Sequence, residues 1–241
     1  WPRTLGSDTL AAYEGPMRYF GAIAGPVANR IAGAAAVIGN RTFRFDPNEG
    51  GRTTLHGGST GTGGQVWQIA SVSDSFVTFE LALPDGQGGF PGHRHLSATY
   101  SISGQSTLRL ELTATTDRET LISLANHAYW NLDGTPDTSG QTLAIAADRY
   151  TPVDESLIPL GEARDVTGTD FDLRRGRALG PATAIDHNFC LSDVPRPSAH
   201  AVTMTGARGV TMEIATTAPG VQIYTAGRMD TGTAPGLTGQ P

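Results

Sequence analysis

Six histidines are the side chains of this sequence best suited to move protons near neutral pH, because imidazole titrates in that range. His127 follows the apolar run LISLA (121–125) and precedes the aromatic segment AYWNL. Aromatic rings cover the apolar face of a pyranose, and polar groups bind its hydroxyls. His127 is therefore our first candidate for the catalytic acid of a sugar site. A histidine held by structural hydrogen bonds is the alternative.

Four other histidines, and the residues beside them, are further candidates for catalysis or ligand binding. His56 lies in TTLHGG, where two glycines permit a tight turn and the close approach of a ligand. His93 and His95 alternate on one strand face and offer two metal ligands, or else a solvated surface. Asp186 and His187 are neighbours in IDHNFCL, so on a strand they point to opposite faces and we expect one of them to face a cleft.

The residue types that are missing exclude several enzyme classes. All 17 cationic side chains are arginines, which excludes mechanisms that need a Schiff-base, pyridoxal-phosphate or P-loop lysine. Cys190 is the single cysteine, so the chain forms neither an intrachain disulfide nor a cysteine zinc cage.

Composition and charge predict a globular, soluble chain. Hydrophobic residues make up 38% and charged residues 17% of the 241 positions, and the net charge is −6. Scattered cations on an acidic chain predict neither nucleic acid nor membrane as a partner. The small-residue stretch 21–39 is interrupted by Pro26, Asn29 and Arg30, and does not predict a membrane span. We expect a cytoplasmic protein; a removed signal peptide is the alternative, because the sequence begins at Trp1 rather than Met.

Alternation of apolar and polar residues predicts strands along the whole sequence. Three consecutive antiparallel candidates are 76–83, 96–103 and 107–113. The second half adds four more, at 142–147, 201–205, 210–216 and 221–225. No linker divides them. The sequence therefore predicts an all-β protein, a large antiparallel β-sandwich in a single domain over 1–241.

Seven segments in order resemble the aldose 1-epimerase (mutarotase) family of the galactose mutarotase-like superfamily. They are YFGAIAGPVANRIAGA (19–34), TTLHGG (53–58), GGFPGHRHLSATYSI (88–102), NHAYWNLDG (126–134), TPVDESLIPLGEARDVTGTDFDLR (151–174), DHNFCL (186–191) and APGVQIYTAG (218–227). Together they span almost the entire chain, which makes chance agreement implausible.

The resemblance implies a super-sandwich fold and the interconversion of α and β anomers of a free hexose such as galactose or glucose. It implies no metal and no organic cofactor. Carried over by position, His127 would protonate the ring oxygen, and His56 would hydrogen-bond near that oxygen and the anomeric centre. The remaining family positions, which would bind sugar hydroxyls or line the cleft, are Asn29, Arg30, Asp186 and Gln222.

One family residue has no counterpart here. The family's general base is a glutamate on a strand after the YTAG segment (224–227), and none of the chain's glutamates occupies the matching position. We therefore expect the domain to be incomplete at both ends, the base to lie beyond Pro241, and the 241 residues alone to be weakly active or inactive.

Two alternative functions follow from the same residues. A catalytically silent carbohydrate-binding module would keep the cleft without the base. A sugar-phosphate epimerase of the same superfamily would gather arginines for the phosphate, and Arg174, Arg175 and Arg177 are the candidates for that cluster.

Overall fold

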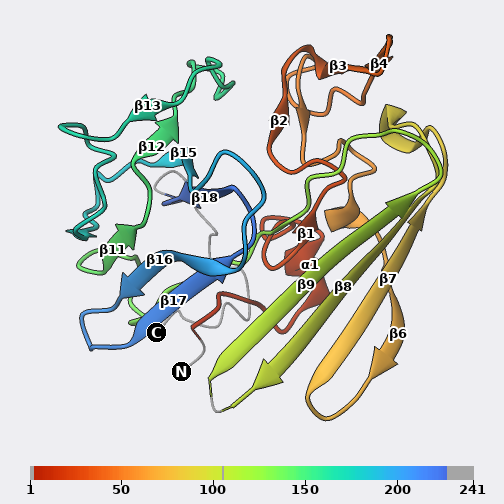
Figure 1. The fold of residues 1–241 in the computed structure, drawn as a ribbon. Helices are drawn as coiled ribbons and strands as arrows, with labels where there is room; N and C mark the ends of the chain where they lie inside the picture. Colours follow the sequence, from red (N-terminus) through yellow and green to blue (C-terminus); the bar gives the residue numbers. More distant parts are fainter. Residues whose placement is uncertain (1–2, 105, 227–241) are drawn as a thin grey trace. The chain divides into compact units, whose positions relative to one another are not determined.

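The computed structural model describes residues 3–104 and 106–226, and the chain forms two compact units (Figure 1). One unit runs from Arg18 to Ala128. The other combines Trp1–Met17 with Tyr129–Pro241. The single domain predicted over 1–241 stays a prediction.

The Arg18–Ala128 unit contains a four-stranded antiparallel sheet in the order β6-β7-β8-β9. Its strands are β6 (Gln68–Val72), β7 (Phe76–Leu83), β8 (Arg94–Ser103) and β9 (Thr107–Thr116). The three strands predicted in this region are confirmed. Leu81 lies opposite Leu96, and Ala98 lies opposite Leu112, so apolar side chains share one face as the alternation requires.

Short strand pairs complete this unit, and they carry the residues of interest. β1 (Ile23–Ala24) pairs with β10 (Ala125–Asn126), β2 (Arg30–Ile31) with β5 (Thr54–Leu55), and β3 (Ala35–Ile38) with β4 (Arg41–Arg44). Three 3₁₀ turns lie between strands: η1 (Ala32–Ala34), η2 (Thr62–Gly64) and η3 (Gln87–Gly89). Each pair joins segments far apart in the sequence, so loop residues beside these strands become spatial neighbours.

The second unit has two four-stranded antiparallel sheets. In the first, β14 (Arg177–Ala178), β11 (Thr142–Ile145), β16 (Ala199–Thr205) and β17 (Thr211–Thr216) lie side by side in that order. In the second, the order is β13 (Arg164–Asp165), β12 (Arg149–Thr151), β15 (Asp186–Cys190) and β18 (Gly220–Tyr224). A single short helix, α1 (Leu10–Tyr13), belongs to the described part of this unit.

One hydrophobic core joins these two sheets. Leu143 and Val202 come from the first sheet, and Tyr150 and Phe189 come from the second; all four are buried in the same cluster. Side chains from two sheets that share one core are the defining feature of a β-sandwich. The predicted all-β, antiparallel architecture is confirmed, and so are the strands predicted in the second half.

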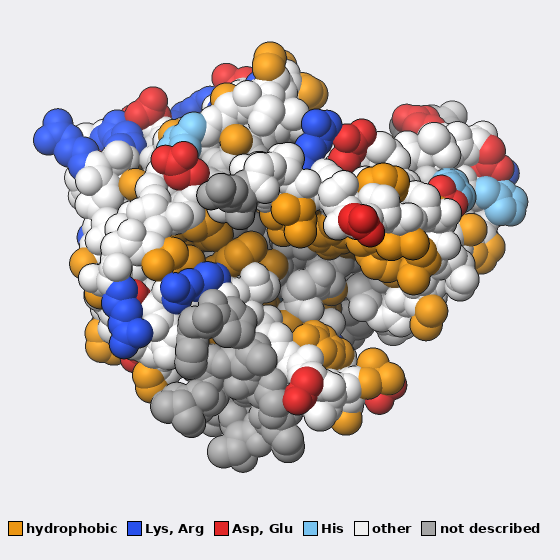
Figure 2. Space-filling model, turned by 90° about the horizontal axis from the view of Figure 1, so that it is seen from below, with side chains coloured by type: hydrophobic (Ala, Val, Ile, Leu, Met, Phe, Trp, Pro, Cys, Tyr) orange, Lys and Arg blue, Asp and Glu red, His pale blue; other side chains and the backbone are white. Residues whose placement is uncertain are grey.

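The surface shows no concentration of charge on the face that Figure 2 draws. There, arginine and acidic side chains of the described residues are dispersed among uncharged ones. Within the same residues, no helix is long and apolar enough to cross a membrane.

Candidate active site

Two histidines from distant segments meet in the Arg18–Ala128 unit. His56 directly follows β5, and His127 directly follows β10; their ring centroids are 5.1 Å apart, with the planes at 85°. The backbone N–H of His127 donates to the carbonyl oxygen of Ala22 (2.9 Å), and the N–H of Gly21 donates to that of His127 (3.1 Å). These bonds extend the β1–β10 pairing by one residue and fix the backbone that carries the His127 imidazole.

Tyr19 packs against both imidazole rings. The Tyr19 ring stacks on His127 with centroids 5.6 Å apart and an interplanar angle of 22°. It meets His56 edge-on, at 4.9 Å and 66°. The guanidinium of Arg18 lies over the Tyr19 ring, 4.7 Å from its centroid. Stacked and edge-to-face contacts of this kind restrict how the three rings can rotate.

Hydrogen bonds define the protonation state of His56. The backbone N–H of Asn29 donates to His56 Nδ1 (3.0 Å), and the backbone N–H of His56 donates to the carbonyl oxygen of Asn29 (3.0 Å). A ring nitrogen that accepts cannot carry a proton, so the proton of the neutral ring lies on Nε2. Burial is the main reason that the pKa of His56 falls to about 3, and the nearby His127, Arg30 and Arg18 contribute to the same decrease. His56 is therefore a neutral hydrogen-bond donor at physiological pH.

Tight turns place His56 against the loop after β1. His56 has a φ of 52° and Gly57 a φ of 86°. A Cβ on Gly57 would collide with the carbonyl oxygen of Gly25, so only glycine allows this approach. The glycines of TTLHGG thus hold His56 beside the 25–30 segment, which explains the motif in physical terms.

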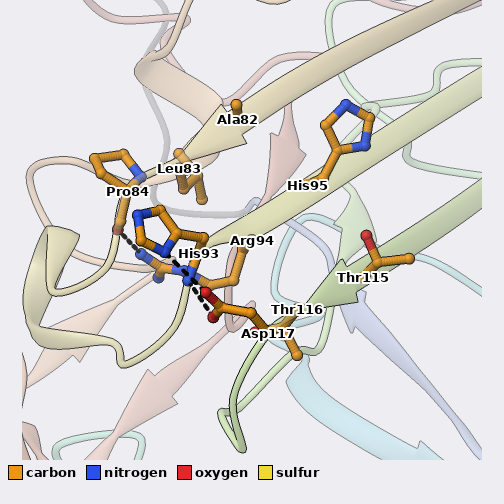
Figure 3. Close-up of a pocket in the computed structure, with 9 residues that line it drawn as sticks. All are labelled: Ala82, Leu83, Pro84, His93, Arg94, His95, Thr115, Thr116 and Asp117. Carbon is orange, nitrogen blue, oxygen red and sulfur yellow. Dashed lines mark hydrogen bonds and ion pairs between the residues drawn. The ribbon is translucent and has the colours of Figure 1, made fainter.

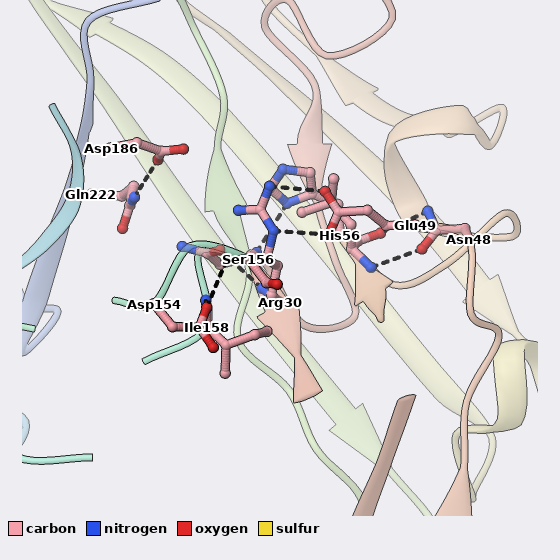
Figure 4. Close-up of polar contacts among 11 residues, drawn as sticks. Arg30, Asn48, Glu49, His56, Asp154, Ser156, Ile158, Asp186 and Gln222 are labelled. Carbon is pink, nitrogen blue, oxygen red and sulfur yellow. Dashed lines mark hydrogen bonds and ion pairs between the residues drawn. The ribbon is translucent and has the colours of Figure 1, made fainter. Parts of the chain in front are cut away.

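Asn29 and Arg30 lie next to His56, because Asn29 directly precedes β2, Arg30 begins it, and His56 directly follows the paired strand β5. The Arg30 guanidinium donates from Nε and Nη2 to the two carboxylate oxygens of Glu49, at 2.8 and 2.9 Å (Figure 4). The Asn29 side-chain oxygen accepts from the backbone N–H of Arg30 (2.9 Å). The structure therefore brings together four of the six residues predicted for the site: Asn29, Arg30, His56 and His127.

The other two predicted residues lie together in the second unit. Gln222 Nε2 donates to Asp186 Oδ1 at 2.7 Å, from β18 to β15 (Figure 4). His187 points to the opposite face, where its ring lies 4.3 Å from that of Phe171 and burial lowers its pKa. Asp186 and His187 thus face opposite ways as predicted, and Asp186 is the one on the Gln222 face.

Known proteins resemble this chain over nearly its whole length. A family model described as aldose 1-epimerase matches residues 2–238. A galactose mutarotase of Mus musculus is 38% identical over 243 residues, which cover 98% of this chain and 70% of that protein. An aldose 1-epimerase of Escherichia coli K12 is 32% identical, covering 91% and 67%. The chain belongs to the aldose 1-epimerase family.

Solved structures agree with this assignment. A GalM/aldose epimerase homologue from C. elegans superimposes with a TM-score of 0.84 at 30% identity, covering 92% of this chain and 70% of that one. A galactose 1-epimerase from Lactobacillus acidophilus NCFM gives a TM-score of 0.83 at 25% identity, covering 98% and 74%. The predicted galactose mutarotase-like fold is thereby confirmed.

In this aldose 1-epimerase family member, two residues that contact the predicted site residues had no role in the sequence prediction. Tyr19 begins the YFGAIAGPVANR run, but nothing in its spacing indicates contact with His56 and His127. Glu49 lies in a glycine-rich turn, and only the tertiary structure brings it to Arg30. Neither residue could have been found from sequence spacing, because both contacts depend on strand pairing.

The metal site suggested by His93 and His95 is not formed. Both line a pocket of about 470 Å³, but each lies beside its own carboxylate. His93 Nδ1 is 2.9 Å from Asp117 (Figure 3), and His95 Nε2 is 3.6 Å from Glu80. Across residues 3–104 and 106–226, no three His, Cys, Asp or Glu side chains are placed to hold a metal ion. None of the six predicted site residues lines this pocket.

Two of the three arginines proposed for a sugar phosphate are already paired with carboxylates. Arg174 binds Asp172 at 2.7 Å and Asp148 at 2.9 Å, and Arg177 lies 3.4 Å from Asp170. Guanidinium groups that are paired with carboxylates offer little net charge to a phosphate. No geometry at these arginines favours the sugar-phosphate alternative.

Proposed function

We propose that this protein, tested from its complete coding sequence, interconverts the α and β anomers of a free hexose, such as galactose or glucose. The observation that carries the proposal is the pair of imidazoles, His127 and neutral His56, held 5.1 Å apart beside Arg30. Membership of the aldose 1-epimerase family supports the reaction class, and the names of the relatives support a monosaccharide as substrate.

The reaction requires two proton transfers on opposite sides of one carbon atom. An acid protonates the ring oxygen while a base removes the proton of the anomeric hydroxyl, so the bond between C1 and the ring oxygen breaks and a free aldehyde forms. Rotation about the C1–C2 bond exposes the other face of the aldehyde. The same groups, with their protons exchanged, then close the ring to give the other anomer.

Within this scheme, His127 is the acid and His56 is a hydrogen-bond donor. A neutral His56 adds no positive charge beside His127, and like charges at such a distance would oppose the protonated state that an acid needs. The Nε2–H of His56 can donate to an oxygen near the anomeric centre, because Nδ1 is already occupied by Asn29.

Neutral hydroxyls of the hexose are matched by fixed polar groups. Asn29 and Arg30 supply them next to His56. The family resemblance assigns the same role to Asp186 and Gln222, which are hydrogen-bonded to each other in the second unit. We assign the general base to no residue of this chain. Glu49 is unsuited to that role, because both of its oxygens accept hydrogen bonds from Arg30.

Polarimetry tests this proposal directly. Protein expressed from the complete coding sequence should accelerate the change in optical rotation of freshly dissolved α-D-galactose or α-D-glucose. No acceleration over buffer would refute the proposal, and saturable hexose binding without acceleration would identify the silent carbohydrate-binding module instead.

A further inference from the structure

Glu49 is anchored to the same strand pair that carries Arg30 and leads into His56. The backbone N–H groups of Glu49 and Thr53 each donate to the other residue's carbonyl, at 3.0 and 3.1 Å. The side chain of Asn48 holds Leu55 of β5 through two hydrogen bonds, at 2.7 and 3.0 Å (Figure 4). Leu55 lies opposite Arg30 in the β2–β5 register. The Glu49 backbone therefore has a fixed position relative to Arg30.

The carboxylate of Glu49 fixes the plane of the Arg30 guanidinium. The two hydrogen bonds, from Nε and Nη2, are nearly equal in length at 2.8 and 2.9 Å. A parallel pair of charge-assisted bonds constrains an arginine in both position and rotation. The Arg30 side chain is only 14% exposed, so solvent screens this pair less than it screens a surface ion pair.

The same geometry leaves part of the Arg30 guanidinium able to donate hydrogen bonds to another group. Arginine has five N–H donors, and Glu49 uses one on Nε and one on Nη2. In the described part of the chain, no acceptor binds Nη1 of Arg30. The free donors therefore point in a direction that Glu49 determines, and their position relative to His56 follows from the β2–β5 pairing.

We propose that Glu49 is a positioning residue that orients Arg30 to bind hexose hydroxyls and thereby controls sugar affinity. This inference rests on the proposed function, in which Arg30 is a hydroxyl ligand. Its competitor is a purely structural ion pair that closes the 49–53 turn. The two differ in what the loss of the carboxylate does to sugar binding.

Replacing Glu49 by Gln tests the inference. Glu49→Gln keeps the size of the side chain but removes one acceptor and the charge, so the KM and the calorimetric Kd for D-galactose should rise roughly 5- to 10-fold. The value of kcat should change by no more than about 2-fold, because Arg30 binds the sugar equally well in the ground state and in the transition state. The matched control is Glu111→Gln, which breaks the exposed Arg109–Glu111 pair of equal length (2.8 Å) in the same unit and should leave KM unchanged.

A double-mutant cycle separates positioning from structure. In an Arg30→Ala background, Glu49→Gln should raise KM no further, because the group it orients is gone. Independent, multiplicative effects would overturn the inference, as would a Glu49→Gln variant with unchanged KM and Kd but a lower free energy of unfolding. Failure of the wild-type protein to bind or epimerise hexoses would instead refute the proposed function, so the two failures are distinguishable.

Discussion

Two pairs of histidines in one compact unit show how differently the fold can use the same residue type. His93 lies just before β8 and His95 lies within it, and the exposed side chain of each is beside its own carboxylate. His56 and His127 are far apart in sequence, yet their rings meet at 5.1 Å, and burial lowers the pKa of His56 to about 3. Burial and shared contacts, rather than sequence proximity, make the second pair suited to proton transfer.

The strongest way to test this comparison is to remove one imidazole from each pair. Replacing His127 by Gln removes the proposed proton donor and should lower the kcat of mutarotation by about 10²- to 10⁴-fold. His95→Gln, which removes an exposed ring, should leave kcat within about 2-fold of wild type. Polarimetry of α-D-galactose with both variants measures the contrast. Normal turnover of His127→Gln would show that another group is the acid.

Disturbing the turn that places His56 should have the next largest effect. In Gly57→Ala the added Cβ meets the Gly25 carbonyl at a φ of 86°, so we expect a loss of about 1–3 kcal/mol in the free energy of unfolding. Gly64→Ala is the matched control, because no atom lies within 4 Å of its Cβ position. Urea unfolding of both variants measures the difference. Equal stabilities would contradict the close approach.

Acid should destabilise the protein through His56. Its pKa is about 3 in the folded state, below the ordinary 6.5, so between these pH values the unfolded chain binds a proton that the folded chain does not. The contribution is complete above pH 6.5 and is lost as the pH falls towards 3, by at most about 1.4 kcal/mol per pH unit.

Urea unfolding of wild type and His56→Gln at pH 7 and pH 4.5 isolates this contribution from that of the carboxylates. The stability difference between the two proteins should shrink at the lower pH. A difference that stays constant would show that the pKa of His56 is not depressed.

The smallest effect should come from the exposed pair. Asp117→Asn removes the ion-pair partner of His93, and both side chains are more than half exposed. We expect no measurable change in the free energy of unfolding, because solvent screens an exposed ion pair, and no change in mutarotation. A clear loss of mutarotation in this variant would give the His93–His95 pocket a role in catalysis and end the contrast between the two pairs.

Much of the fold could be predicted, because strand formation depends on a pattern among residues that are neighbours in the sequence. Alternation in 76–83 reproduces the bounds of β7, and four strands of the second half, β11, β16, β17 and β18, were found in the same way. The strand pairs β1–β10 and β2–β5 were not predicted. Each of their strands is only two residues long, too short to show a period, and the pairing is non-local.

The sequence by itself determined the all-β class, the likeness to a family and the six residues predicted for the site. Only the tertiary structure decided that the rings of His56 and His127 meet, that the His56 proton lies on Nε2, and that Glu49 holds Arg30. The physical reason is that alternation is a property of neighbouring residues. Protonation states and ion pairs instead depend on burial and on distances between segments that only strand register sets.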